Sequence, residues 1–188
     1  SRNDVMKEWI GYYENALPDT LSKNIMNIKD GWKPSGFSNH DGRAKDEYNK
    51  KRVISDEFYI TQYTEFYDDL FKATSIVNSA YKKLHPYMKY MSSVRCTNFK
   101  VSKYKEGGFM SAHADAIHHS HGQNYGFPET TVLFFPNADY EGGEFVIADI
   151  TYKPKKNSAI MFPSNFMFPH YVKPITKGTR YSIITWLM

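Results

Sequence analysis

The chain has 188 residues, of which 41% are hydrophobic and 16% aromatic, enough for one sizeable core but short of what two full domains usually need. The net charge of +4 is small and disfavours a nucleic-acid partner. The single cysteine, Cys96, excludes an internal disulfide and favours a reducing compartment, so we expect a cytoplasmic location. No run of about 18 apolar residues occurs, so we expect a soluble protein that does not enter a membrane.

Two segments of the first half predict helices. Residues 17–28, "LPDTLSKNIMNI", carry apolar side chains at helical spacing behind Asp19, the expected N-cap. Residues 64–84 carry apolar side chains on one helical face, and Pro86 predicts that this helix ends near His85. These helices would be amphipathic and would each cover a neighbouring layer.

The second half predicts strands. Short apolar runs alternate with turn signals at intervals of roughly 8 to 12 residues, with no helical segment between them, which indicates an antiparallel sandwich or barrel rather than a parallel sheet. These runs are "VRCTNFKVSKY" (94–104), "ETTVLFFPN" (129–137), "GEFVIADITY" (143–152), "SAIMFP" (158–163) and "TRYSIITWLM" (179–188).

The expected architecture is therefore a single α+β domain over residues 1–188. Its core would be a double-stranded β-helix, or jelly roll, formed by residues 91–188. Residues 1–90 would supply mainly helical support. They also include residues 30–52, a polar, glycine-containing segment that predicts a long surface loop of the kind that often forms a lid.

Four of the seven histidines lie in the segment "GFMSAHADAIHHSHG", residues 108–122. Of these, His113 alone has an aspartate, Asp115, two positions further on. In an extended strand such residues point to the same side, so both could reach one metal ion. The remaining three, which we expect on a solvated loop, are His118, His119 and His121.

Two more polar residues stand out near the end of the chain. After His121 there is one further histidine, His170, and after Arg95 one further arginine, Arg180. A jelly roll would bring both close to the His-x-Asp pair. Two imidazoles and a carboxylate suit non-haem Fe(II) and leave coordination positions for a chelating cosubstrate and oxygen. An arginine in the same cavity offers a planar fork for a carboxylate.

With these motifs, residues 94–188 resemble the 2-oxoglutarate and Fe(II)-dependent dioxygenases, and within them the prolyl 4-hydroxylase branch. The resemblance is carried by "YKEG" (104–107), "HAD" (113–115), "EGGEF" (141–145), "HYVKPI" (170–175) and "GTRYSIITW" (178–186). It implies metal ligands at His113, Asp115 and His170. It also implies that Arg180 holds the distal carboxylate of 2-oxoglutarate with help from Tyr104.

The resemblance further implies an activity. The enzyme would use Fe(II) and 2-oxoglutarate, with ascorbate as a reductant, and would hydroxylate a proline-containing peptide or protein while releasing succinate and carbon dioxide. Such a peptide would lie near residues 33–52 and 116–130. Related enzymes that demethylate nucleobases carry a second arginine where this chain has Trp186, which we expect in the core of the last strand. A nucleic-acid substrate is again disfavoured.

Two other functions stay open at this point. The substrate could be a free amino acid or another small molecule. Alternatively, the chain could be a cupin-like binding module without enzymatic activity. Against the module, "HSH" at 119–121 is followed by Glu129, which is too distant for the usual cupin pattern. A binding module also gives no reason for Arg180 ten positions after His170.

Overall fold

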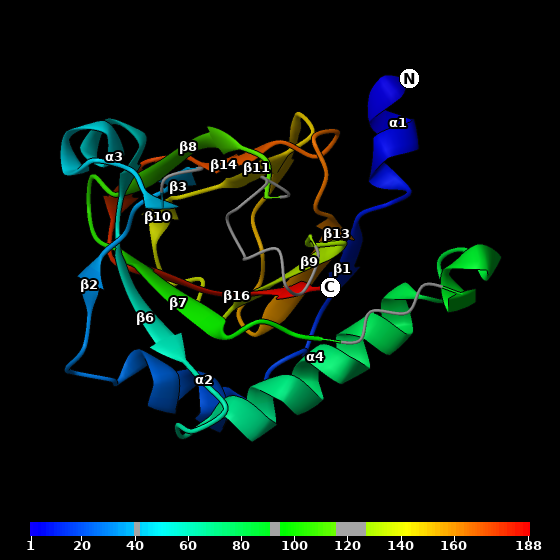
Figure 1. The fold of residues 1–188 in the computed structure, drawn as a ribbon, viewed down its shortest axis with the longest axis horizontal. Helices are drawn as coiled ribbons and strands as arrows, with labels where there is room; N and C mark the ends of the chain where they lie inside the picture. The colour runs from blue at the N-terminus through cyan, green and yellow to red at the C-terminus, as the bar shows by residue number, and fades with distance from the viewer. Residues whose placement is uncertain (40–41, 91–94, 116–126) are drawn as a thin grey trace.

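A sandwich of two antiparallel sheets forms the centre of the protein in a computed structural model, which describes residues 1–39, 42–90, 95–115 and 127–188 (Figure 1). The larger sheet contains, in order, β1 (Gly11–Tyr13), β13 (Ser158–Pro163), β9 (Thr130–Phe135), β16 (Arg180–Leu187), β7 (Phe99–Tyr104), β6 (Asp56–Ile60) and β2 (Lys33–Pro34). The smaller sheet contains, in order, β12 (Ile150–Tyr152), β11 (Phe145–Ile147), β14 (His170–Val172), β8 (Phe109–His113) and β5 (Val53–Ile54). The expected jelly roll is confirmed.

Short elements complete the fold. Two further strand pairs are β10 (Glu141–Gly142) with β15 (Ile175–Lys177) and β3 (Ser38–Asn39) with β4 (Gly42–Arg43). The helices are α1 (Arg2–Lys7), α2 (Asp19–Met26), α3 (Asp46–Arg52) and α4 (Tyr67–Tyr81), and a 3-10 turn, η1, covers Pro86–Tyr90. Within the described ranges, no helix combines the length and the apolar character that a membrane span requires.

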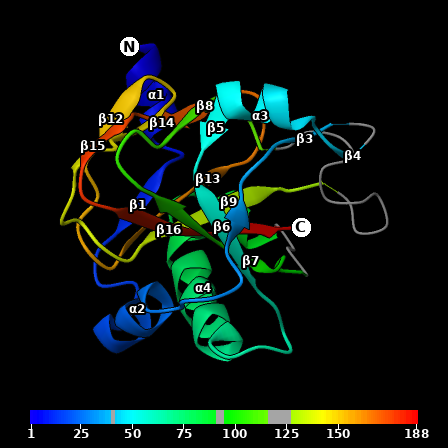
Figure 2. The same ribbon diagram turned by 90° about the vertical axis from the view of Figure 1, so that its left-hand side faces the viewer.

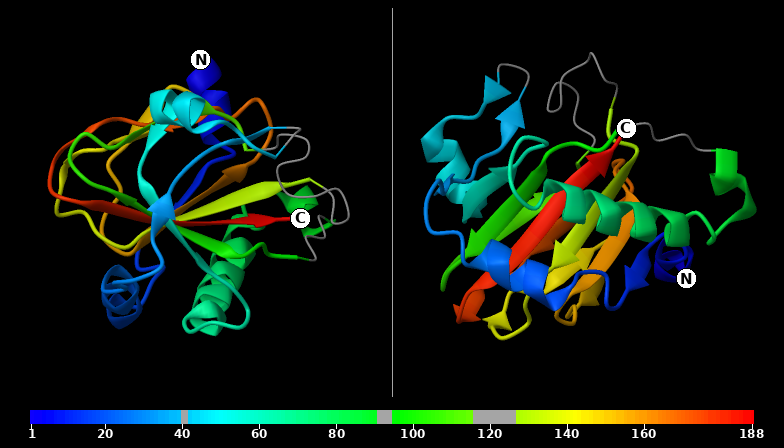
Figure 3. Two further views of the ribbon diagram at one scale, coloured as in Figure 1. Left: turned by 60° about the vertical axis from the view of Figure 1, so that its left-hand side comes forward. Right: turned by 90° about the horizontal axis from the view of Figure 1, so that it is seen from below.

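The helices α2 and α4 lie across the outer face of the seven-stranded sheet, while the five-stranded sheet covers its inner face (Figures 2 and 3). Strand β9 shows why this arrangement is stable. Val132 and Phe134 belong to the core beneath the helices, whereas Leu133 and Phe135 belong to the core between the sheets. A strand that is buried on both faces must be apolar almost throughout, as "TTVLFF" is.

Several boundaries differ from those expected. Helix α4 ends at Tyr81, four residues before His85, and Leu84 beyond it is 42% exposed. Helix α2 is present, but its N-cap is Pro18 and no side chain caps it. The carboxylate of Asp19 instead pairs with basic side chains, Lys23 at 2.9 Å and Lys156 at 3.2 Å.

The expectation of a long surface loop over residues 30–52 is wrong. That segment contains β2, the β3–β4 pair and α3, and two of its residues, Ala44 and Asn49, are buried. The first half is also less helical than expected, because β1, β5 and β6 extend the two sheets. The run "GEFVIADITY" forms two strands, since Ala148 and Asp149 adopt positive φ values of 48° and 64° and turn the chain back.

The buried face of α4 provides a test of how the helical layer is attached. Leu70 is fully buried against the seven-stranded sheet, whereas Ile76 on the same helix is 63% exposed. We expect Leu70→Ala to lower the free energy of unfolding by about 2 to 5 kcal/mol, because it leaves a cavity in the core. Ile76→Ala should change it by less than about 0.5 kcal/mol. Urea unfolding of both variants measures the difference, and equal effects would contradict this packing.

Candidate functional site

Three polar side chains meet between the two sheets. Strand β14 pairs antiparallel with β8 in a register that puts His170 opposite His113. Asp115 follows β8 and its side chain turns toward both rings, so that Oδ1 lies 3.4 Å from His113 Nε2 and 3.1 Å from His170 Nε2. One potential ligand atom from each residue lies within 4.8 Å of the others. The geometry brings together the three residues that the sequence singled out.

Asp115 is not part of the extended strand on which the spacing argument relied. Strand β8 ends at His113, and Asp115 lies in a bend directly after it. The carboxylate is held there by Thr131 on β9, whose hydroxyl donates to Asp115 Oδ2 at 2.8 Å. Ser164 in turn lies 2.8 Å from the Thr131 hydroxyl. Thr131 of the seven-stranded sheet therefore fixes the side chain of Asp115, although Asp115 follows a strand of the five-stranded sheet.

Both imidazoles are oriented by the backbone. His113 Nδ1 lies 2.9 Å from the carbonyl oxygen of Ser111, and His170 Nδ1 lies 3.0 Å from that of Phe168. With a carbonyl as partner, Nδ1 must carry the proton and donate it. Each Nε2 is then left with a free electron pair directed at Asp115. This is how metal-binding histidines are normally oriented in proteins.

The charges of the three groups are strongly coupled. Burial by itself raises the pKa of Asp115, but the rings of His170 and His113 outweigh it and hold that pKa well below its usual range. Burial lowers the pKa of His170, yet the Asp115 carboxylate more than compensates and leaves that pKa raised. Burial and the neighbouring His170 lower the pKa of His113. The donor set of two neutral imidazoles and a carboxylate fits a divalent metal such as Fe(II).

A second charged group lies deeper in the same sandwich. Arg180 begins β16, is fully buried, and its guanidinium has no hydrogen-bond partner among the described residues. Its Cζ lies 5.1 Å from the centre of the Tyr104 ring and 5.6 Å from that of Phe135. Tyr104 is the cross-strand neighbour of Arg180. A buried, unpaired guanidinium fits a site that receives an anion, and the sequence had assigned it to a carboxylate.

The motif "EGGEF" makes room for this arginine. Gly143 has φ 64°, and a Cβ there would lie 3.0 Å from Arg180 Cδ. Any other residue would be strained in that backbone conformation and would press on the arginine side chain. The glycine therefore allows the β10–β11 connection to pass close to the guanidinium.

The remaining sequence-derived candidates have different outcomes. The three histidines expected on a solvated loop, His118, His119 and His121, lie outside the described residues. Tyr104 is buried beside Arg180, and its hydroxyl lies 3.6 Å from Met110 Sδ. Trp186 is half-buried rather than fully enclosed, and it shares the inner row of β16 with Arg180.

Sequence reasoning missed two kinds of contact at the site. Thr131 was overlooked, although a polar side chain in the apolar run "TTVLFF" was a usable signal. The wall formed by residues 30–52 was also missed. Phe37 packs edge-on against the His113 ring at 5.2 Å between centres, and the Arg52 guanidinium lies 5.0 Å above Phe37. Arg52 is fixed to β8 by the Ser111 hydroxyl at 2.5 Å and the carbonyl of Ala112 at 3.0 Å.

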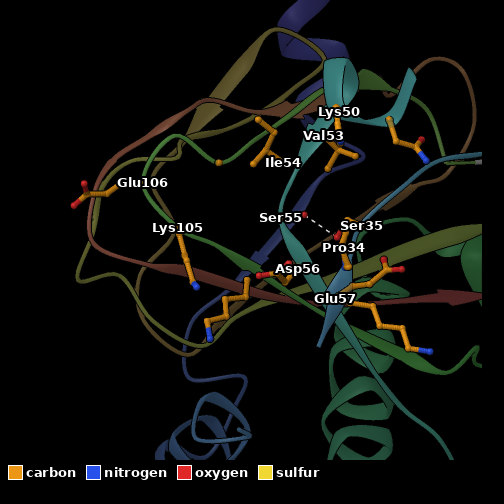
Figure 4. A pocket seen from close by; sticks show the side chains of 14 residues that line it. Pro34, Ser35, Lys50, Val53, Ile54, Ser55, Asp56, Glu57, Lys105 and Glu106 are labelled. Atoms are coloured by element: carbon orange, nitrogen blue, oxygen red, sulfur yellow. Dashed lines mark hydrogen bonds between the residues drawn. The ribbon is translucent and has the colours of Figure 1, made fainter. Parts of the chain in front are cut away.

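A surface pocket of about 660 Å³ lies at the corner where the chain passes from β5 to β6 (Figure 4). Its walls carry both signs of charge, and the hydroxyls of Ser35 and Ser55 are hydrogen-bonded across it at 2.8 Å. Neither the metal-binding triad nor Arg180 lines this pocket. It is therefore separate from the site between the sheets. The charged side chains in its lining are Lys33, Lys50, Asp56, Glu57, Lys103, Lys105 and Glu106.

The known proteins that this chain is similar to are oxygenases and hydroxylases. Residues 99–188 match the model of the 2OG-Fe(II) oxygenase superfamily. A PKHD-type hydroxylase of Idiomarina loihiensis is 25% identical over 184 residues, which span 92% of this chain and 74% of that protein. Prolyl 3-hydroxylase 2 of Gallus gallus is 36% identical over 69 residues, a third of this chain (33%) but only 10% of the avian protein. A PKHD-type hydroxylase of Alteromonas mediterranea is 44% identical over 61 residues, 30% of this chain and 26% of that protein.

Solved structures share the fold. A viral collagen prolyl hydroxylase from Paramecium bursaria Chlorella virus-1 superposes with a TM-score of 0.68 at 17% identity, covering 95% of this chain and 94% of that one. A prolyl hydroxylase from Trichoplax adhaerens, solved with a peptide fragment of hypoxia inducible factor, gives 0.69 at 16% identity, covering 100% of this chain and 86% of that one. At these identities the likeness concerns the fold.

The Thr131 hydrogen bond should affect metal affinity without touching the metal. We expect Thr131→Val to weaken Fe(II) binding by about 10- to 100-fold, because the Asp115 carboxylate loses the donor that orients it. Thr130→Val is the matched control, since its buried hydroxyl has no hydrogen-bond partner among the described residues. Anaerobic metal titration measures both affinities. If the two variants bound Fe(II) equally well, Thr131 would have no orienting role.

Metal binding should weaken in mild acid. Metal must displace the proton of His170, whose pKa is raised above the ordinary histidine value of about 6.5. The proton competes once the pH falls below that pKa. The metal affinity should therefore change little near pH 8 and should fall as the pH is lowered from near neutrality. His113, with a lowered pKa, should add to the loss only at lower pH. Titrations with Mn²⁺ between pH 5 and 8 test this, and an affinity independent of pH over that range would refute it.

Proposed function

We propose that this chain is a 2-oxoglutarate-dependent dioxygenase that hydroxylates prolyl residues in a peptide or protein, since residues 99–188 match the model of the 2OG-Fe(II) oxygenase superfamily. One observation supports this proposal above the others. The buried guanidinium of Arg180, which has no hydrogen-bond partner in the described part of the chain, occupies the same inter-sheet space as two imidazoles and a carboxylate arranged for one metal ion. A binding module of the cupin kind would need the metal ligands but has no use for Arg180.

The proposed ligands are His113 Nε2, His170 Nε2 and the carboxylate of Asp115. When bound, Fe(II) supplies the coupling of oxygen reduction to oxidation of 2-oxoglutarate and of the substrate C–H bond. The contribution of the chain is to fix these donors and to exclude water. Phe145 and Phe162 lie 5.6 Å and 5.1 Å from the His170 ring, between centres, and shield it on the inner side.

Arg180 is proposed to bind the distal carboxylate of 2-oxoglutarate. A charge that is buried in a protein interior without a partner lowers the stability of the folded protein by roughly several kcal/mol. Its planar fork can pair both oxygens of a carboxylate at once. Tyr104 lies against the guanidinium and would form the opposite wall for the same group. Binding of the cosubstrate would then offset the unfavourable free energy of burying the Arg180 charge.

The substrate is proposed to be a proline-containing peptide that enters beside His113. Support comes from similarity to proteins named as prolyl hydroxylases, one of them solved with a peptide. In this chain the wall nearest His113 consists of Phe37 and Arg52, from the segment first expected to be a lid. A cytoplasmic location and the use of ascorbate as a reductant remain predictions from the sequence.

A panel of candidate substrates tests the proposal. Proline-rich peptides would be compared with free proline, lysine and nucleotides, with Fe(II), 2-oxoglutarate and ascorbate present throughout. We expect succinate release coupled to a gain of one oxygen atom on a peptide, and NMR of the product would assign the hydroxylated carbon. Coupled turnover with free amino acids alone would support a small-molecule hydroxylase. Absence of succinate release with every compound would contradict the enzymatic proposal.

Replacing Arg180 tests the choice of cosubstrate. Loss of a buried charge-assisted pair costs about 2 to 5 kcal/mol, so Arg180→Ala should lower 2-oxoglutarate affinity by roughly 30-fold or more. Arg180→Lys should recover part of it, because lysine keeps the charge but loses the second contact. Fe(II) affinity should barely change in either variant. Anaerobic titration of the Fe(II) protein with 2-oxoglutarate provides the measurement, and unchanged affinity in Arg180→Ala would exclude this role.

A further inference from the structure

The inner face of β7 carries an unexpected row of polar residues. Phe99 and Val101 point to the helical layer and belong to its core. The alternate residues Lys100, Ser102 and Tyr104 therefore face the space between the sheets. Tyr104 is accounted for by Arg180, its cross-strand neighbour. Lys100, at the other end of the row, is a lysine on the inner wall of the sandwich and has no role in the function proposed so far.

The turn that joins β7 to β8 places Lys100 at the depth of the His113–Asp115–His170 triad. Both strands leave the same turn, residues 105–108, and run side by side in facing sheets. Near the turn, Tyr104 touches Met110. Lys100 lies four residues further along β7, about 13 Å away from Tyr104, and His113 lies at the corresponding end of β8. The anion site at Arg180 is thus near the turn, and Lys100 is beyond it on the side of the triad.

The surroundings of Lys100 support this position. Its Nζ lies 5.7 Å from the centre of the Trp186 ring, on the inner row of β16. Lys100 is half-buried, and no carboxylate pairs with it among the described residues. The ammonium is therefore held beside an aromatic ring on the inner face of the sheet, and no described carboxylate compensates its charge.

A balance of charges shows what such a lysine would select. With Fe(II) and 2-oxoglutarate bound, the positive charges of the metal, Arg180 and Lys100 exceed the negative charges of Asp115 and the cosubstrate by one. Arg180 and the metal would already hold the two ends of the cosubstrate. A partly desolvated cation without a partner attracts an anion more strongly than the same cation in water. The remaining anion would have to come from the substrate.

We infer that Lys100 and Trp186 form a subsite on the seven-stranded sheet that binds a carboxylate of the substrate, next to the carbon that is hydroxylated. This inference rests on the proposed function and makes it more specific. The substrate would be a peptide in which an acidic residue flanks the target proline. The aromatic ring would pack against the apolar part of the peptide, and the ammonium would bind the carboxylate in a charge-assisted hydrogen bond.

Peptide binding tests this without requiring turnover. The wild-type protein would be loaded anaerobically with Fe(II) and 2-oxoglutarate. It would then be titrated with two dye-labelled peptides that differ only in Asp or Asn beside the proline. By fluorescence anisotropy we expect the Asp peptide to bind about tenfold more tightly, and Lys100→Met to lose most of that preference. Lys100→Glu should instead favour a Lys-flanked peptide, a gain that misfolding cannot produce.

Lys103 supplies the matched control. It lies on the same strand but on the opposite face, with Nζ 5.1 Å from the Trp32 ring, so Lys103→Met removes a lysine over an aromatic ring outside the site. This variant should keep the wild-type preference for the Asp peptide. Two outcomes would overturn the inference. In one, Lys100→Met keeps the preference and leaves 2-oxoglutarate binding unchanged. In the other, Lys100→Met keeps the preference but weakens 2-oxoglutarate binding, which would assign the ammonium to the cosubstrate.

Failure of the proposed function would look different. In that case no peptide would gain oxygen under air, even if the wild type still distinguished the Asp from the Asn peptide in anaerobic binding. Binding of neither peptide would contradict the Lys100 inference directly, since it names an acidic peptide as the ligand. Turnover of peptides with equal affinity for Asp and Asn would leave the enzyme proposal standing and remove the subsite.

Discussion

The pairing of β14 with β8 is the interaction on which the site depends. It sets His170 opposite His113, and each ring is oriented by the carbonyl two residues before it, at residues 168 and 111. A shift of this pairing by one residue would turn one imidazole to the other face of the sheet. The proposed metal site is thus encoded in strand register, and the pairs β11–β14 and β5–β8 hold that register from either side.

The seven-stranded sheet supplies what the smaller sheet lacks. Thr131 on β9 orients the Asp115 carboxylate, Arg180 on β16 carries the buried charge, and Lys100 on β7 lies over the Trp186 ring. Three neighbouring strands therefore direct polar side chains inward at different depths. The helices on the outer face allow this, because α2 and α4 bury the apolar residues of the same strands. The large core under the helices then offsets the stability that is lost at the polar inner positions.

The predictable part of this structure lies where local pattern and tertiary environment agree. The apolar periodicity of α4 and the runs of β9 and β13 match their burial, so both were found from sequence. The His-x-Asp pair and the isolated His170 and Arg180 indicated a shared site, and all four lie between the two sheets.

The errors have physical causes. Asp115 reaches the triad from a bend because Thr131 holds it there, a contact between residues 16 positions apart that no local pattern contains. Residues 30–52 are polar in sequence, yet Arg52 and Phe37 anchor them by contacts to β8 and His113. Lys100 was overlooked for the same reason. That Lys100 faces the space between the sheets follows only from the alternation of side chains along β7 and from which face of the strand the helices cover.

The central claim is that one inter-sheet cavity holds a metal at the triad and a dicarboxylate at Arg180. A crystal structure of the protein grown anaerobically with Fe(II) and 2-oxoglutarate tests it most directly. The account predicts iron bound by His113 Nε2, His170 Nε2 and Asp115, with one end of 2-oxoglutarate on the iron and the far carboxylate on the Arg180 guanidinium. Iron at other residues, or a cosubstrate that leaves Arg180 without a partner, would contradict it.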